Sequence, residues 1–121
     1  MASARVVQAE AATSGALAHF DGVVLNALRE TQSSLATYAG DTTRADALRT
    51  AYRSAIESAD ETHRLYSAGR ENFVADLDAT RTLTGVAAQV ASAEAQVAQD
   101  QVNLFLALGG GWEREEAVAG K

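Results

Sequence analysis

The stretch Tyr66-Ser67-Ala68-Gly69-Arg70-Glu71-Asn72-Phe73 decides the fold, because it separates two long helical patterns. Gly69 is placed to take the left-handed conformation that commonly ends a helix. Asn72 is a suitable N-cap for a second helix that begins at Phe73. A short turn of this kind between two helices predicts an antiparallel helical hairpin.

Mostly apolar side chains recur before this turn at steps of three or four residues, which is the spacing of a coiled-coil seam. They are Leu17, Phe20, Val24, Leu28, Thr31, Leu35 and Tyr38, and then Leu48, Tyr52, Ile56, Ala59 and Leu65/Tyr66. We expect one helix of roughly 55 residues, from about Ser14 to Ala68. Gly40 could loosen or bend it, and Asp41-Thr42-Thr43 could re-cap a restarted helix.

The segment after the turn carries a second seam, with Leu83, Val86, Val90, Ala93, Val97 and Leu104 as its members and Asp100 interrupting it. This pattern predicts a helix from about Phe73 to Ala107, roughly 50 Å long. Both helices carry Ala and Ser on more than one face, and two helices alone cannot bury several faces. We therefore expect further helices around this hairpin, from another part of the protein or from other subunits.

Composition agrees with long helices and excludes several kinds of protein. The 121 residues suffice for one ordinary domain, with no Pro to break helices and no Cys to form disulfides or thiolate metal sites. Alanine accounts for 27 residues, which favours helix but fills a core poorly. The net charge of −6 argues against a nucleic-acid partner.

No arrangement of residues points to catalysis. His19 and His63 share no metal-ligand spacing, so we expect them to be exposed or packed side chains. Gly109-Gly110-Gly111 follows a helix instead of opening one, so it is not a phosphate-binding loop. We therefore expect no enzyme, no metal and no cofactor.

The N-terminal sequence lacks the apolar core of a secretory signal, and no apolar run is long enough for a transmembrane helix. Taken alone, the chain would be a cytosolic protein. The alternative is that Met1 is an internal position of a longer protein. Residues 1–16 have a composition that favours helix, although weak alternation leaves a strand open.

Three motifs resemble the TolC-like outer-membrane efflux channels, especially the NodT-type lipoprotein subgroup. Asn26–Gln32 is similar to part of "LxALRExExAL", and Leu65–Leu83 looks like the tip motif "YxxGxxxFxxxLDAxRxL". Leu104–Trp112 resembles the terminal "LxxALGGGW". The motifs occur in the family's order and cover residues from about 5 to 113.

The resemblance implies a subunit with two similar halves that works as a homotrimer. Strands of three subunits would close one outer-membrane barrel, and helices would form a long periplasmic tunnel. The tunnel's gated tip would meet a periplasmic adaptor (membrane fusion) protein and, through it, an inner-membrane pump of the RND type. The channel would be a passive conduit for exported small molecules, and this chain resembles its last quarter or so.

On that layout the chain divides into five parts, with the full-length protein in the outer membrane and periplasm. Residues 1–16 would be the end of a barrel strand or a helix lead-in, 17–68 the long tunnel helix, 69–72 the periplasmic tip turn, 73–108 the returning helix and 109–121 a Gly-rich tail. Trp112 would pack at the tunnel's waist instead of anchoring at the membrane interface.

The resemblance also implies a docking site for the adaptor at Tyr66, Gly69, Arg70 and Glu71. Family members often carry a basic residue two positions after the glycine, and that position is Glu71 here. The alternative is that Gly69 only ends a helix and Tyr66 only packs.

A ring of carboxylates at the tunnel entrance is a second implication. Asp78 matches the Asp of the LDA part of the tip motif, and Asp76 lies beside the position where some members carry a further acid. One carboxylate from each subunit would favour cations and repel anions. The alternative is an exposed first-turn acid that complements the helix dipole.

A different class of function also fits part of the sequence. A stand-alone coiled-coil module that self-associates through the Leu/Val seams would explain the periodicity and the missing signal. It would not explain the tip motif or the Leu108-Gly109-Gly110-Gly111-Trp112 end.

Overall fold

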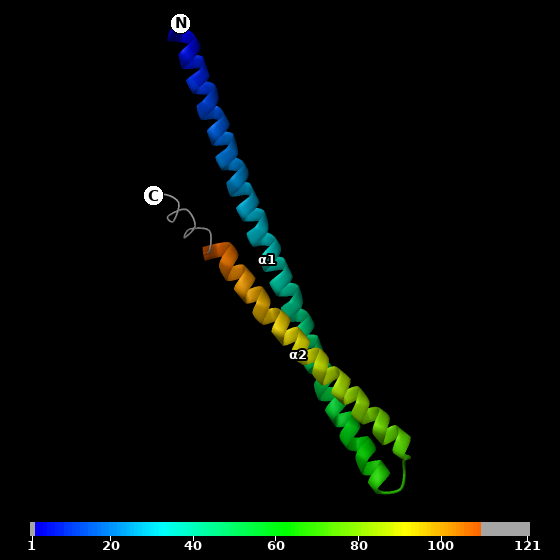
Figure 1. Cartoon of the computed structure of the whole chain (residues 1–121). Coiled ribbons are helices and arrows are strands. Elements are labelled where there is room, and N and C mark those ends of the chain that lie inside the picture. Colours follow the sequence, from blue (N-terminus) through cyan, green and yellow to red (C-terminus); the bar gives the residue numbers. More distant parts are fainter. Residues whose placement is uncertain (1, 110–121) are drawn as a thin grey trace, which may run out of the picture.

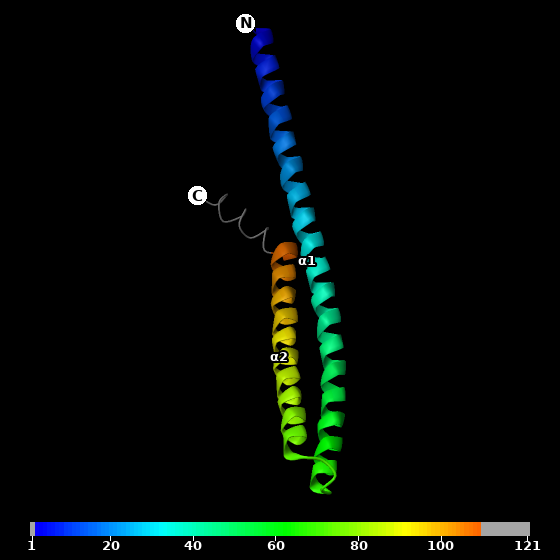
Figure 2. The same ribbon diagram turned by 90° about the vertical axis from the view of Figure 1, so that its right-hand side faces the viewer.

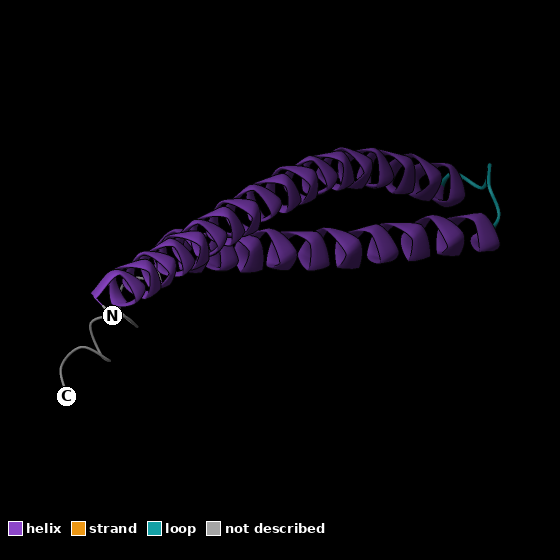
Figure 3. Cartoon of the chain, turned by 90° about the horizontal axis from the view of Figure 1, so that it is seen from above, coloured by secondary structure: helices purple, strands orange, loops and turns teal. Residues whose placement is uncertain are grey.

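The computed structural model describes residues 2–109, which form two helices joined by a short turn. Helix α1 runs from Ala2 to Ser67 over 66 residues, and helix α2 runs from Phe73 to Gly109 over 37 residues. At 1.5 Å per residue the helices are about 100 Å and about 55 Å long. They lie antiparallel, so this part of the chain is the rod-like helical hairpin that the two seams predicted (Figures 1 and 3).

Helix α2 covers only the C-terminal half of α1. The two helices lie side by side from the turn to the end of α2, and the N-terminal part of α1 continues beyond it without a neighbour (Figures 1 and 2). Arg29 and Ser33 of α1 share a surface hollow with Asn103 and Leu106 of α2, which marks where α2 ends along α1. The unequal helix lengths are the reason for the overhang.

The contact between the helices follows a heptad pattern on both of them. The buried and half-buried residues at the heptad positions are Thr31, Ser34, Tyr38, Asp41, Ala45, Leu48, Tyr52, Ala55, Ala59 and Thr62 on α1, and Asp76, Ala79, Leu83, Val86, Val90, Ala93, Val97, Asp100, Leu104 and Ala107 on α2, while Thr42, Ile56, Leu65, Ala75, Leu77 and Ala87 are half-buried beside them. We call the residues at the heptad positions the heptad seam. Its most deeply buried alanines are Ala45 and Ala93, at 1% and 2% exposure, so the helix backbones approach each other closely at its centre.

The first members of the predicted seam face no other helix within residues 2–109. Leu17, Phe20, Val24 and Leu28, here called the apolar stripe, are between 40% and 64% exposed, because α2 does not reach them. Leu35 is also 48% exposed, and Ser34 takes the inward position beside it. The pairing with α2 therefore begins at Thr31 and not at Leu17.

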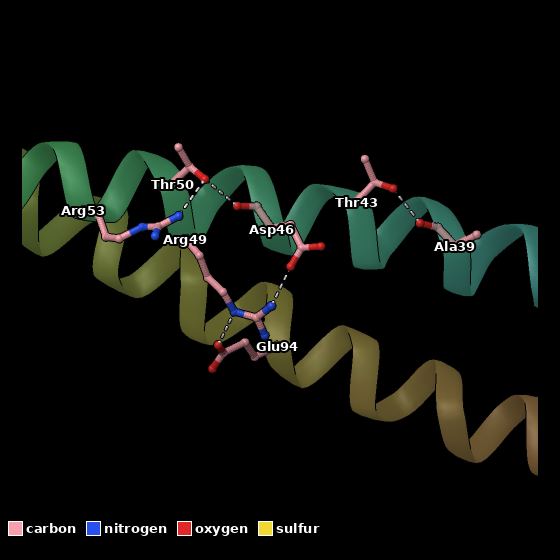
Figure 4. Close-up of polar contacts among 7 residues, drawn as sticks. All are labelled: Ala39, Thr43, Asp46, Arg49, Thr50, Arg53 and Glu94. Atoms are coloured by element: carbon pink, nitrogen blue, oxygen red, sulfur yellow. Dashed lines mark hydrogen bonds and ion pairs between the residues drawn. The ribbon is translucent and has the colours of Figure 1, made fainter.

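The structure settles two points that the sequence left open in α1, and the first agrees with the helical composition of residues 1–16. Residues 2–16 are helical, which decides against a strand in this chain, because a helix satisfies its backbone groups internally whereas a strand needs a neighbour. Helix α1 also runs through Gly40 without a break, so no restarted helix is capped there. Thr43 instead donates from Oγ1 to the carbonyl oxygen of Ala39 at 3.0 Å, within the same helix (Figure 4).

Trp112 and the rest of the predicted tail beyond Gly109 lie outside the described residues.

Candidate functional site

The turn is closed by backbone hydrogen bonds around Gly69. The amide of Arg70 donates to the carbonyl oxygen of Leu65 at 2.8 Å, and the amide of Gly69 donates to that of Tyr66 at 2.9 Å. These two bonds form a Schellman motif, which satisfies carbonyls that a helix end leaves free. Gly69 has a φ of +73°, in the left-handed region that is costly for residues with a Cβ. The helix-stop conformation predicted for Gly69 is therefore present.

The start of α2 is fixed by side chains of the turn. Asn72 accepts a hydrogen bond from the amide of Ala75 at its Oδ1, at 2.8 Å, as an N-cap does. Glu71 accepts one from the amide of Asn72 at its Oε1, at 3.0 Å. Both acceptors satisfy donors that would otherwise be free at the end of the hairpin. Glu71 thus lies against the turn's own backbone.

An aromatic pair joins the two helix ends across the turn. The rings of Tyr66 and Phe73 have centroids 5.9 Å apart and planes inclined at 58°, which is a favourable arrangement for aromatic side chains. Tyr66 is 38% exposed and Phe73 is 58% exposed, so both also present apolar surface to the outside. Arg70 is exposed next to them and forms no ion pair with any residue between 2 and 109.

The two acids predicted at the tunnel entrance have different surroundings. The side chain of Asp76 is only 15% exposed, and its two carboxylate oxygens each lie 3.3 Å from Nδ1 of His63. Asp78 is exposed and lacks an ion-pair partner among the described residues. Since residues two apart on a helix do not share a face, the structure does not bring Asp76 and Asp78 together.

A contact between His63 and Asp76 was not expected from the sequence. The signal for it lies in the turn: His63 is about one helical turn before the end of α1 at Ser67, and Asp76 is about one helical turn after the start of α2 at Phe73. Residues placed in this way face each other across an antiparallel hairpin.

An ion-pair cluster farther from the turn also escaped sequence analysis. Arg49 binds Asp46 of its own helix from Nη1 at 2.8 Å and Glu94 of α2 from Nε at 3.0 Å (Figure 4). The hydrogen bond to Glu94 is the main cause that raises the pKa of Arg49 above its ordinary value. On the same helix, Arg53 donates from Nη2 to Oγ1 of Thr50 at 3.3 Å.

The described residues offer little else to a ligand. Between residues 2 and 109 no three His, Asp or Glu side chains come together as a metal ion would require. His19 lies on the part of α1 before Thr31, far along the helix from His63. Over the same range, neither helix contains a segment of sufficient length and apolarity to span a membrane. The turn and its flanking side chains are thus the most distinctive site of the hairpin.

Comparisons with known proteins place this hairpin in a family. A family model described as "Outer membrane efflux protein" matches residues 1–110. The chain is 37% identical over 114 residues to "Outer membrane protein OprJ" of Pseudomonas aeruginosa, an alignment that covers 91% of this chain and 23% of that protein. The chain thus spans about a quarter of the length of that relative. No solved structure gives a significant match. The resemblance found in the three sequence motifs is confirmed, and the chain belongs to the outer membrane efflux protein family.

Proposed function

We propose that this chain is the C-terminal tunnel hairpin of an outer-membrane efflux channel subunit. The observation that carries the proposal is the match of the efflux-protein family to residues 1–110, together with a long hairpin that ends in a tightly built turn. In this proposal α1 descends toward the channel's periplasmic tip and α2 returns from it. Membership in a family of efflux proteins also agrees with the expectation that the chain is not an enzyme.

The exposed apolar side chains support an assembly of several helices. The apolar stripe on α1, and Phe105 and Leu106 near the end of α2, are all at least 40% exposed. Burying such side chains releases roughly 25 cal/mol per Å² of apolar surface, so neighbouring helices would stabilise them. In the proposal these neighbours are the other helices of a homotrimer, whose full-length subunits lie in the outer membrane and periplasm.

The tip turn is the proposed docking site for a periplasmic adaptor that connects the channel to an inner-membrane pump. Tyr66 would offer a partly exposed ring to the adaptor, and Gly69 would allow the tight turn of the backbone. Arg70 would offer a positive charge that forms no ion pair with residues 2–109. Glu71 would act mainly by holding the turn, because its carboxylate already accepts a bond from Asn72. Asp78, which is exposed, is the proposed carboxylate at the entrance for exported small molecules, and Asp76 is proposed to position the hairpin through His63.

The test uses the full-length protein that carries this segment, in cells that lack other efflux channels. Arg70→Glu is expected to lower export of a fluorescent dye by about tenfold, because a reversed charge at an interface costs affinity. Gly69→Leu is expected to abolish export while trimers still form on native gels. Arg53→Glu makes the same charge change on the side of α1 and serves as the control.

Normal export by both tip variants would overturn the docking role. Loss of export by Arg53→Glu as well would point to a general folding defect instead. Asp78→Asn is expected to reduce export of cationic dyes more than that of neutral ones.

Self-association of a stand-alone module is the second candidate, and the exposed apolar stripe is the observation that favours it. Sedimentation of the 121-residue chain separates the two. A single well-defined helical oligomer would support the module. A concentration-dependent mixture of species would support a channel segment that lacks its neighbours.

A further inference from the structure

An acidic side chain lies buried in the centre of the helix contact. Asp100 is only 3% exposed, and the other buried residues between positions 2 and 109 are all alanines. An ionised carboxylate in such a place is costly unless it is paired. The carboxyl group of Asp100 therefore needs hydrogen-bond partners inside the heptad seam.

The register of the hairpin brings Asp41 to Asp100. On one side of this level, Gln101 donates from Nε2 to the hydroxyl oxygen of Tyr38 at 3.3 Å. On the other side, Arg49 binds Glu94 at 3.0 Å. Asp41 lies between these two contacts on α1, and Asp100 lies between them on α2, so the register places both side chains at the same level of the heptad seam.

The hydrogen bonds of Asp100 are incomplete without a proton. Its Oδ1 accepts from Nε2 of Gln96 at 3.0 Å, whereas its Oδ2 is buried and has no donor among the described residues. The Oγ1 of Thr42, beside Asp41, is also buried without a partner in that range. One proton held between the two carboxyl groups would supply the missing donor for Oδ2.

The other charged and titratable groups near the pair do not replace that proton. Arg44 on α1 acts against it, since its positive charge lowers the pKa of Asp41. Arg49 is already bound to Asp46 and Glu94. The hydroxyl oxygen of Tyr38 accepts the bond from Gln101, and its own hydrogen does not reach Oδ2 of Asp100, which has no hydrogen-bond partner among the described residues.

We propose that Asp41 and Asp100 form a proton-binding site that holds α1 and α2 together at this level and weakens their contact as the pH rises. With one proton, one carboxyl group donates to the other. Without it, two like charges face each other across the heptad seam. Gly40, which precedes Asp41, is a poor helix former and adds no stability to α1 at this level. This proton-binding site concerns the stability of the hairpin and does not depend on the proposed efflux function.

The direction of the pH dependence follows from proton binding. The hydrogen bond with Asp100 is the largest cause that raises the pKa of Asp41 above its ordinary value of 3.8, followed by burial and the negative charge of Asp100. The folded hairpin therefore binds this proton more tightly than the unfolded chain. Its contribution to stability is complete below the unfolded pKa and is lost as the pH rises through the folded pKa.

The experiment compares Asp41→Asn with the wild-type chain in thermal unfolding followed by circular dichroism, from pH 4 to pH 9. The side-chain amide of Asn can donate a hydrogen bond to Asp100, and it does not lose a proton as the pH rises. We expect it to raise the melting temperature at pH 8 by about 3 °C or more and to flatten the decline with pH. Asp60→Asn removes an exposed acid of the same helix and should follow the wild-type profile.

A second measurement does not depend on a variant. Carboxyl-carbon NMR of the wild-type chain should show that one proton of the Asp41/Asp100 pair is released at a pH above the ordinary range of an aspartic acid side chain. Parallel wild-type and Asp41→Asn profiles, or ordinary titration of both carboxyl groups, would overturn the proposal.

Discussion

His63 on α1 and Asp76 on α2 face each other next to the turn, with Nδ1 of His63 at 3.3 Å from both carboxylate oxygens of Asp76. The His63 side chain is 67% exposed and that of Asp76 is 15% exposed, so the contact lies at the edge of the heptad seam. Asp76 also belongs to the first turn of α2, where a negative charge complements the helix dipole. The pair thus ties the start of α2 to the end of α1.

Removing the imidazole should loosen the end of the hairpin. In His63→Ala, Asp76 loses its cross-helix partner, and we expect amide hydrogen exchange of residues 66–76 to become about two- to five-fold faster. His19→Ala is the matched control, because His19 lies on the unpaired part of α1. Equal exchange rates around the turn in wild type and His63→Ala would show that the contact contributes nothing.

Gly69→Ala should destabilise the hairpin through the backbone alone. A Cβ at this position would meet no atom within 4 Å, but the φ of +73° is unfavourable for any residue with a side chain. We expect a cost of about 1 kcal/mol, seen as a melting temperature lower by about 3–6 °C. Gly85→Ala on α2 provides the comparison, since its Cβ also has open space but its helical conformation favours alanine. A Gly69→Ala variant as stable as wild type would contradict the strained-turn interpretation.

Asn72→Ala should remove the cap of α2. The bond from the amide of Ala75 to Oδ1 of Asn72 is lost, and we expect a cost of about 1 kcal/mol in urea unfolding. Asn72→Asp keeps the acceptor and should retain the wild-type midpoint. If both variants unfolded at the same urea concentration, the capping bond would not matter for stability.

Local sequence chemistry was sufficient to predict the hairpin and its turn. Gly69 and Asn72 mark helix ends through their own conformation and side chain, so no knowledge of the rest of the fold is needed. The family likewise followed from three short motifs. Such features depend on residues that are neighbours in the chain.

Cross-helix contacts could not be predicted in the same way. The partners of Arg49, His63 and Asp41 depend on the register between the helices, which the sequence pattern leaves open within a turn of helix. The place where pairing begins, at Thr31 and not Leu17, depends on the length of α2. Asp76 was grouped with Asp78 because it lies beside the position where some family members carry a further acid, although residues two apart on a helix lie on different faces.

The alanines of the heptad seam should resist enlargement more than alanines outside it. Ala93 is 2% exposed, whereas Ala95, two residues on, is exposed on the same helix. Leucine at position 93 would force α1 and α2 apart, at a cost of about 1–3 kcal/mol that the extra apolar burial does not offset. Leucine at position 95 should change stability by no more than about 0.5 kcal/mol. Thermal unfolding of Ala93→Leu and Ala95→Leu measures the difference directly. Equal stability would mean that the helices tolerate a wider separation, and that close approach through alanine is not what holds this hairpin together.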